Sequence, residues 1–277
     1  MKIKKIFEIA GWTMALAGTT FLLAFANSEQ DKTVCQAINI QLYHGNDTLI
    51  NEKEILEKIK KNFGDIKGRA IHNIPFRNME AEILKISALD QCDVFATLSG
   101  TVNIIGKERI PLLKIFNHQN ISYYIDNKGV IFKTKPPYSA RILVANGNIT
   151  LAPKEGSNIF HLPDSIKGVS QLKTLYHLAH YIDKDKTLKA LTSQIYIDNQ
   201  GEIELIPLIA NQVIILGDTS NLPEKLENLL IFYKRLGNIS QLDKYRTVNL
   251  KYKNQIVCTK NIIYGNEGEN TQPVGNH

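Results

Sequence analysis

Two histidines three residues apart, His177 and His180, have the best spacing for metal chemistry in this sequence. Residues three apart lie on one face of a helix, so both imidazoles can reach one ion. Zinc usually requires a third protein ligand, and only Asp183, one turn further on, is placed to supply it. A polar strip beside Tyr176 and Ala179 explains the two histidines better. We therefore expect no metal ligand and no cofactor.

The sequence also gives no support for nucleophilic catalysis or redox chemistry. The sequence contains no Gly-x-Ser-x-Gly, phosphate loop, dinucleotide fingerprint or zinc-protease motif. The spacing of Cys35, Cys92 and Cys258 fits no metal or redox motif, and we expect them to be small apolar residues buried at strand ends. No nucleophile, base and orienting group come together, so the sequence predicts a protein that is not an enzyme and has no catalytic residues.

An apolar run near the N-terminus predicts a membrane anchor. It extends over residues 6–26 and contains one charge, Glu8. Such a run reaches the length of about 20 residues that spans a bilayer as a helix. Lys2, Lys4 and Lys5 precede it, and cationic flanks stay in the cytoplasm. We therefore expect a cytoplasmic stub at 1–5, a transmembrane helix at 6–26 and export of everything after about residue 27.

A cleaved signal peptide is the alternative for this segment, because Ala24-Phe25-Ala26 has an A-x-A pattern. The apolar run is longer than the roughly 7–15 residues of a signal peptide's hydrophobic region, which favours an uncleaved anchor. Both alternatives export the rest of the chain. The net charge of +6 and the pI near 9.0 come from scattered lysines. They predict a solvated basic surface near anionic lipid, not a nucleic-acid-binding protein.

A short polar linker, 27–34, leads into a first exported domain at 35–110. The alternation of Ala37–Tyr43 predicts a strand. A helix begins at Asn51, with Glu54 completing a capping box and with Ile55, Leu56, Ile59 and Phe63 on its inner face. A second helix begins at Asn78, with Ile83, Leu84 and Ile86 inward. Strands at Asp93–Leu98 and Thr101–Lys107 follow, so we expect two helices on one face of a three-stranded sheet.

A second domain at 111–260 is mostly short strands, so the fold class is α+β. Two helices interrupt the strands, one capped by Ser170 and one with Pro223 in its first turn and Gly237 as its stop. The last element, Thr247–Val257, is predicted as one long strand. The tail at 261–277 is polar and Gly-rich, and we expect it to be disordered. The remaining predicted strands are Ile121–Ile125, Val130–Phe132, Ile142–Val144, Gln194–Ile197, Glu202–Ile206 and Val213–Leu216.

Four local motifs follow the anchor in a fixed order. They are Val102–Pro111 with its Glu-x-x-Pro exit, Tyr124–Gly129 with Asp-x-x-Gly, Val213–Gly217 followed by Lys225-Leu226, and Val248–Tyr252. This order, over residues 6–258, resembles the FtsQ/DivIB family of bacterial cell division proteins. The chain departs from the family at Asn249, where Asp is favoured, and at Leu143, where Pro is frequent.

The resemblance implies a transmembrane helix, a POTRA domain (β-α-α-β-β) and a strand-rich β-domain with two helices. It also implies a non-enzymatic scaffold of the divisome, in the inner membrane at the division septum with its bulk in the periplasm. Its implied partners are FtsB- and FtsL-like single-pass proteins and other septal wall-synthesis proteins. The alternatives are an exported POTRA module of outer-membrane assembly or secretion machinery, and a periplasmic hydrolase.

The last predicted strand is our candidate partner-binding site, acting by β-augmentation. It follows the helix that ends at Gly237, it precedes the tail, and Lys251 and Lys253 on its polar face suit an exposed edge. We expect acidic partner residues to complement these two lysines. The alternative is an ordinary closing strand with charges for solubility. The candidate residues are Thr247, Val248, Asn249, Leu250, Lys251, Tyr252, Lys253, Asn254, Gln255, Ile256 and Val257.

Overall fold

The computed structural model describes residues 11–21, 33–45 and 47–261. These residues form two compact units. The first unit contains the chain up to Pro111 together with Asp126–Arg141 and Lys154–Ser157, and the second contains Leu112–Ile125, Ile142–Pro153 and the chain from Asn158 onward. The predicted stub at 1–5, most of the linker at 27–34 and the tail from residue 262 lie outside the described residues.

Residues 11–21 are helical. Within the described parts of the chain, no helix is both long and apolar enough to span a bilayer. The predicted transmembrane segment at 6–26 extends past this helix at both ends, into residues that the structure does not describe. It therefore stays a prediction.

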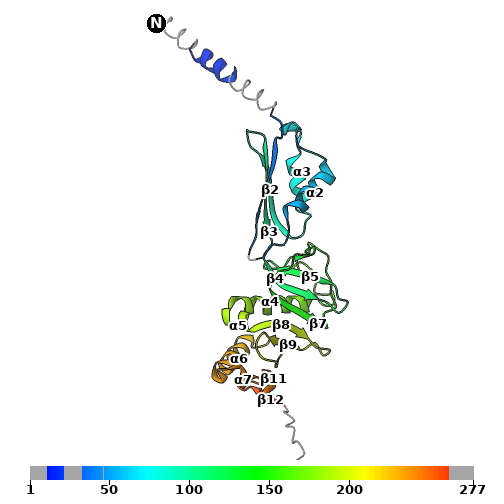
Figure 1. The fold of residues 1–277 in the computed structure, drawn as a ribbon, viewed down its shortest axis with the longest axis vertical. Coiled ribbons are helices and arrows are strands. Elements are labelled where there is room, and N and C mark those ends of the chain that lie inside the picture. Colours follow the sequence, from blue (N-terminus) through cyan, green and yellow to red (C-terminus); the bar gives the residue numbers. More distant parts are fainter. Residues whose placement is uncertain (1–10, 22–32, 46, 262–277) are drawn as a thin grey trace, which may run out of the picture. The chain divides into compact units, whose positions relative to one another are not determined.

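The first unit has the predicted order of strand, helix, helix, strand, strand. Its sheet has the order β1-β3-β2, in which β1 is parallel to β3 and β2 is antiparallel to it. The helices α2 and α3 lie on one side of this sheet (Figure 1). The bounds are β1 Ala37–Tyr43, α2 Glu52–Phe63, a 3-10 turn at Ile71–Asn73, α3 Phe76–Ile83, β2 Leu89–Ala96 and β3 Thr101–Glu108.

The core of the first unit forms where inward strand residues meet the helices. The Asn51 side chain accepts the Glu54 N–H at 2.9 Å, so the predicted cap of α2 is confirmed, and Gly64 ends the helix. Ile55 and Ile59 are buried, whereas Leu56 is 40 % exposed. Successive helix residues are turned by about 100°, so Leu56 lies at the margin and its predicted inward position is wrong.

The second helix of this unit begins earlier than predicted. It starts at Phe76 after Pro75, not at Asn78. This shift makes Met79 and Ile83 the buried residues of α3. Leu84 follows the last helical residue and is 40 % exposed. Its predicted inward position is therefore wrong, while Ile83 and Ile86 are buried as predicted.

A buried ion pair fastens a later segment of the chain to the first unit. The carboxylate of Asp126, which is 1 % exposed, accepts a bond from Arg109 Nη1 at 2.8 Å. Arg109 also donates from Nε to the Ser87 carbonyl at 2.7 Å. Further along, the Tyr138 hydroxyl accepts from Asn51 Nδ2 at 3.0 Å. These bonds explain why residues 126–141, with the short strand β6 (Ile131–Phe132), pack with the first unit.

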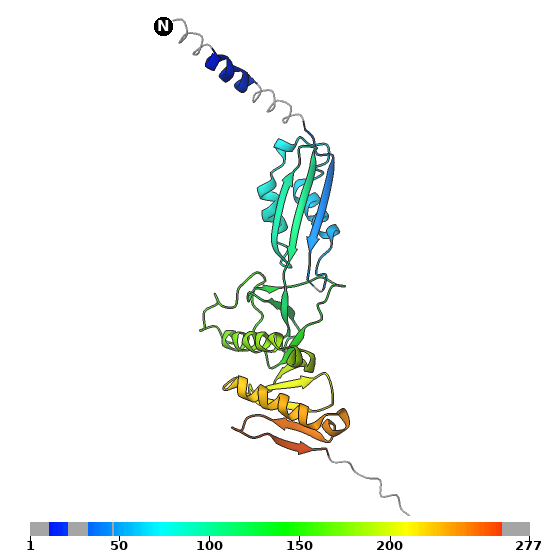
Figure 2. The same ribbon diagram turned by 90° about the vertical axis from the view of Figure 1, so that its left-hand side faces the viewer.

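The second unit is built on a sheet whose strands run β12-β11-β10-β9-β8-β7-β4-β5. Strand β4 was not predicted, and neither were the short helices α5 and α7, so the predicted count of two helices in this domain is wrong. Figure 2 shows α6 beside the strands of the C-terminal end. The strands are β4 Pro111–Phe116, β5 Ser122–Asp126, β7 Leu143–Gly147, β8 Thr192–Ile197, β9 Ile203–Pro207, β10 Val213–Gly217, β11 Tyr245–Asn249 and β12 Val257–Lys260. The helices are α4 Val169–Lys184, α5 Lys186–Leu191, α6 Leu222–Leu236 and α7 Ile239–Leu242.

The fold predicts a sharp contrast between two neighbouring positions of α2. Ile59 is 2 % exposed and Leu56 is 40 % exposed. Replacing Ile59 by Asp puts an unpaired carboxylate in the core and should destabilise the first unit by several kcal/mol. Leu56→Asp, the matched control, should change the melting temperature little. Thermal unfolding followed by circular dichroism measures both, and equal melting of the two variants would contradict this packing.

Candidate partner-binding surface

The predicted long strand at Thr247–Val257 is wrong. The chain forms two short antiparallel strands, β11 and β12, joined by a reversal at 250–256. The Asn249 side chain accepts the Lys251 N–H at 3.0 Å, and Asn254 has φ +59°. Asn adopts this left-handed conformation more readily than most residues. These local features turn the chain where the alternating pattern alone indicated a strand.

The reversal changes which strand lies at the edge of the sheet. Strand β11 is parallel to β10 on one side and antiparallel to β12 on the other. Among the described residues, β12 is the outermost strand at this end of the sheet. The expectation that no later strand covers Thr247–Asn249 is therefore wrong. Of the predicted binding residues, only Val257 lies in the edge strand itself.

The open side of β12 is defined by its hydrogen bonds. The Asn261 N–H donates to the Lys244 carbonyl at 2.8 Å, which directs it toward the preceding strand. The irregularity in the pairing of β11 and β12 falls on β11, at Tyr245/Thr247, so β12 keeps a regular two-residue alternation. The peptide groups of Thr259 and Val257 then face β11. Those of Cys258 and Lys260 face outward.

The eleven predicted residues differ in exposure. Val248 and Leu250 are buried in the core of the second unit. Tyr252 is 52 % exposed and Val257 is 44 % exposed. The others divide into half-buried Thr247, Asn249 and Ile256, and exposed Lys251, Lys253, Asn254 and Gln255.

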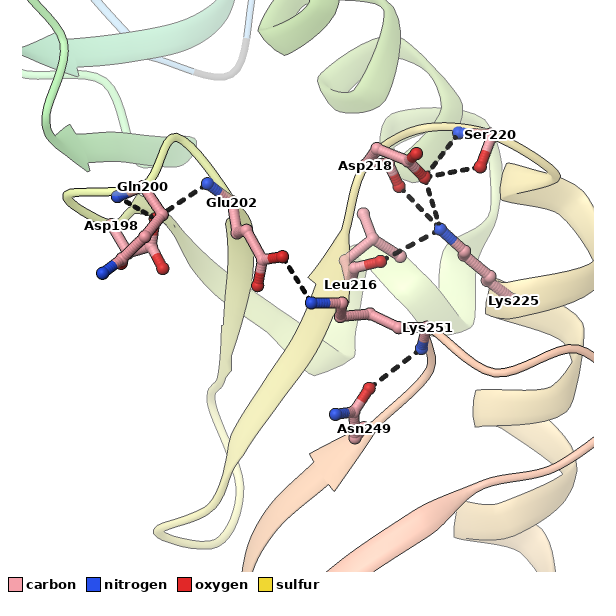
Figure 3. A network of polar contacts seen from close by, with 9 residues as sticks. All are labelled: Asp198, Gln200, Glu202, Leu216, Asp218, Ser220, Lys225, Asn249 and Lys251. Atoms are coloured by element: carbon pink, nitrogen blue, oxygen red, sulfur yellow. Dashed lines mark hydrogen bonds and ion pairs between the residues drawn. The ribbon is translucent and has the colours of Figure 1, made fainter.

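A largely buried lysine, Lys225, holds the loop next to the reversal (Figure 3). The Lys225 ammonium on α6 donates to the carbonyls of Leu216 and Asp218 at 3.0 and 2.9 Å and to the Asp218 carboxylate at 2.8 Å. Its side chain is only 11 % exposed. The bonds from Lys225, and then those from Ser220, lower the pKa of Asp218 to about 2. All three donors of this lysine are thus used to fix the loop between β10 and α6.

Lys251 is also paired within the chain, so its expected contact with a partner stays a prediction. Its ammonium forms an ion pair with Glu202, the residue before β9 (Figure 3), and this bond raises the pKa of Lys251. Its aliphatic stem crosses Gly217, where a Cβ would lie 2.8 Å from Lys251 Cγ. Gly217 also has φ +75°, a conformation that favours glycine. We predicted Lys251 as a partner contact, but this structure pairs it within the chain.

The turn that contains Glu202 has the same hydrogen-bond pattern as a second turn in this protein. The Asp198 carboxylate accepts the N–H groups of Gln200 and Glu202 at 2.9 and 2.8 Å (Figure 3). Asp126 accepts those of Lys128 and Val130 in the same way, both at 2.8 Å. The sequence Tyr-Ile-Asp-Asn-x-Gly occurs at both places, at 124–129 and 196–201. This repeat was visible in the sequence, and our sequence analysis missed it.

A small cleft lies between the reversal and the start of α6. Its volume is ≈ 60 Å³, and Asn221, Lys225, Tyr252 and Ile256 are among its lining residues. Small-molecule sites usually enclose about 300–1,000 Å³. A cleft of this size has room for a side chain, so the geometry suits contact with another polypeptide better than a small ligand.

Residues 110–259 match the family model described as FtsQ/DivIB, C-terminal related, which is 150 of the chain's 277 residues. The chain belongs to the FtsQ/DivIB family. Residues 33–105 match a POTRA-like domain, so the resemblance found in the sequence is confirmed. No individually curated protein matches the chain. Both matching families are non-enzymatic scaffold types.

The side chains that first suggested metal chemistry lie elsewhere in this FtsQ/DivIB chain. His180 stacks on Tyr176 at 5.9 Å between ring centroids, and His177 lies 5.8 Å from the Phe160 ring. In the part of the chain that the structure describes, no three His, Cys, Asp or Glu side chains are grouped to hold an ion. Cys35 and Cys92 are free and buried, whereas Cys258 on β12 is half-buried.

The lysine under the reversal should carry a measurable share of stability. Lys225→Met removes three charge-assisted hydrogen bonds and leaves the buried Leu216 carbonyl unpaired, which should cost ~2 kcal/mol. Lys234→Met, on the exposed surface of the same helix, is the control and should have little effect. Urea unfolding at pH 7 measures both free energies.

The same variant should change the response to acid. Because the pKa of Asp218 is lowered from 3.8 to about 2, its stabilising contribution is full above its ordinary pKa and is lost as the pH falls toward 2. Lys225→Met removes the largest cause of this shift, so its stability should fall less steeply over that range. Parallel acid-unfolding curves for the wild type and the variant would contradict this assignment.

Proposed function

We propose that this protein is a bitopic scaffold of the bacterial divisome. Residues 6–26 anchor it in the inner membrane, its N-terminus is cytoplasmic and its two units are periplasmic. It gathers at the division septum and links septal wall-synthesis proteins. Membership of the FtsQ/DivIB family supports this role, and the lysines before the apolar run support the orientation.

The observation that carries the binding proposal is the open side of β12. An extended segment of a partner gains main-chain hydrogen bonds by adding to such an edge. The outward peptide groups of Cys258 and Lys260 offer these bonds. Because β12 is only four residues long, the added segment is short. The proposed partners are FtsB- and FtsL-like single-pass division proteins, each contributing an exported strand.

Side chains around the edge supply selectivity in this proposal. Val257 and Tyr252 present apolar surface beside the strand, at 44 % and 52 % exposure. Lys253 and Lys260 are exposed cations that would favour an acidic partner segment, because complementary charge selects the partner and speeds association. Lys251 contributes less, because it is paired with Glu202.

A proline tests the edge directly. Cys258→Pro removes an outward N–H and places its ring toward an incoming strand, while the bonds to β11 remain. Binding to the exported segment of the FtsB-like partner should weaken at least about tenfold. Cys258→Ala keeps the N–H and should bind like the wild type. Isothermal titration measures affinity, and the melting temperature checks that both variants are folded. Equal affinity of the two variants would rule out augmentation at β12.

Localisation tests the cellular role separately. A fluorescent protein fused to the N-terminus should form a band at mid-cell in dividing cells, because septal partners recruit the scaffold. The matched comparison is a fusion that carries Cys258→Pro, which should keep the membrane signal and lose part of the band. An even rim for the wild type would contradict a divisome role and leave only the membrane anchor.

A further inference from the structure

One end of the first unit combines exposed cations with an exposed leucine. We call this end the basic tip and define it by Lys60, Lys61, Lys67, Arg69 and Leu98. All five side chains are exposed, and Leu98 is 83 % exposed. Among the described residues, Lys60, Lys61 and Lys67 form no ion pair, and Asp65 is the acidic neighbour.

Backbone bonds place these residues beside the point where the chain enters the unit. Cys35 N–H donates to the Arg69 carbonyl at 2.9 Å, and Gly68 N–H donates to the Cys35 carbonyl at 2.8 Å. On the other side, Gln36 N–H donates to the Gly100 carbonyl at 2.9 Å. The α2–α3 connection and the β2–β3 turn therefore flank residues 33–36 (Figure 1).

The leucine is held on a rigid turn. Thr97 N–H donates to Thr101 and Gly100 N–H donates to Thr97, at 2.9 and 3.0 Å. Gly100 has φ +81°, and a Cβ there would lie 2.3 Å from the Val34 carbonyl oxygen. The turn is thus pressed against the entering chain with Leu98 projecting. Packing within the unit does not explain a leucine fixed in water.

The distribution of charge along α2 also sets the basic tip apart from the opposite end of the helix. Its first half carries Glu52, Glu54 and Glu57 against a single lysine, Lys53, and its last turn carries Lys60 and Lys61. Basic residues in a last turn complement the helix dipole, which accounts for these two lysines. Arg69 also serves this helix end, because its guanidinium donates to the carbonyls of Phe63 and Asp65 at 3.1 and 3.2 Å. The dipole does not account for Lys67 or Leu98, which lie outside the helix. Cations around a protruding apolar side chain are typical of surfaces that contact anionic lipid.

We propose that the basic tip rests on the anionic surface of the bilayer. The three lysines contact lipid phosphates, Arg69 adds its positive charge while it stays bonded to the Phe63 and Asp65 carbonyls, and Leu98 enters the interfacial layer. This inference rests on the proposed anchor, because a chain that leaves the membrane before residue 33 brings this end of the unit to the bilayer first. Its consequence is an oriented first unit, held by a second contact besides the anchor.

Tryptophan quenching in the full-length protein tests this contact. Trp12 is the single native tryptophan, so Leu98→Trp in a Trp12→Phe background reports the tip alone. The control is Tyr43→Trp at the far end of β1, about 20 Å away for seven residues. Both proteins are reconstituted in vesicles of equal parts phosphatidylglycerol and brominated phosphatidylcholine. The Leu98→Trp protein should be quenched at least twice as strongly as the Tyr43→Trp protein.

Charge changes test the electrostatic part. Lys61→Glu with Lys67→Glu should abolish the excess quenching at position 98. The matched control, Lys53→Glu with Lys107→Glu, makes the same change in net charge at the other end and should retain it. All four lysines are exposed, and melting temperatures confirm folding. Vesicles without phosphatidylglycerol, or ~1 M salt, should also reduce the quenching, since salt screens surface charges.

Several results would overturn the inference. Equal quenching at positions 98 and 43, or quenching that ignores the tip charges, would exclude a lipid-bound tip. A Leu98→Trp protein that floats with vesicles but stays unquenched would refute the tip and leave the anchor standing. A protein that does not float with the vesicles would refute both the lipid-bound tip and the membrane anchor. An unquenched tip whose charge reversal abolishes the septal band would assign the cluster to a protein partner instead.

Discussion

The buried bond between Arg109 and Asp126 is the constraint on which the two-unit organisation depends. The chain leaves the first unit after Pro111 and returns to it at Asp126, so the two partners stand just before the exit and at the return. Asp126 is almost fully buried, and breaking one side of a buried pair costs about 3–5 kcal/mol. The Asp126 side chain also organises the turn to Val130. One carboxylate therefore ends β5, shapes the hairpin and attaches residues 126–141 to the first unit.

Much of the first unit could be predicted from local sequence signals. The alternation of Ala37–Tyr43 and the Asn51 cap depend on neighbouring residues, and both appear in the structure as expected. Strand β4 was missed because Pro111–Phe116 does not alternate: Leu112, Leu113 and Ile115 are all buried. The prediction for the end of the second unit was wrong for another reason. Its strand pattern continues through a turn set by the Asn249 side chain and by Asn254, which alternation does not register.

The candidate site was predicted in part only. The sequence pointed to the C-terminal strands as the partner-binding site, but it placed the edge of the sheet one strand too early. The pairing of Lys251 with Glu202 joins residues 49 positions apart, so no local pattern contains it. The three bonds of Lys225 depend likewise on the path of the loop from Leu216 to Asp218. Sequence patterns identify which strands exist, whereas the order of strands in the sheet decides which of them is open.

The lysine that lies across Gly217 also limits how this family member can change over evolutionary time. Residue 217 has a left-handed backbone, so Asn is the most tolerable replacement, yet any Cβ collides with the stem of Lys251. Such a replacement requires the Lys251 side chain to move aside or residue 251 to shorten, and either change disturbs the ion pair with Glu202. Positions 202, 217 and 251 should therefore change together, as a covarying triplet in which the glycine is the last to be released.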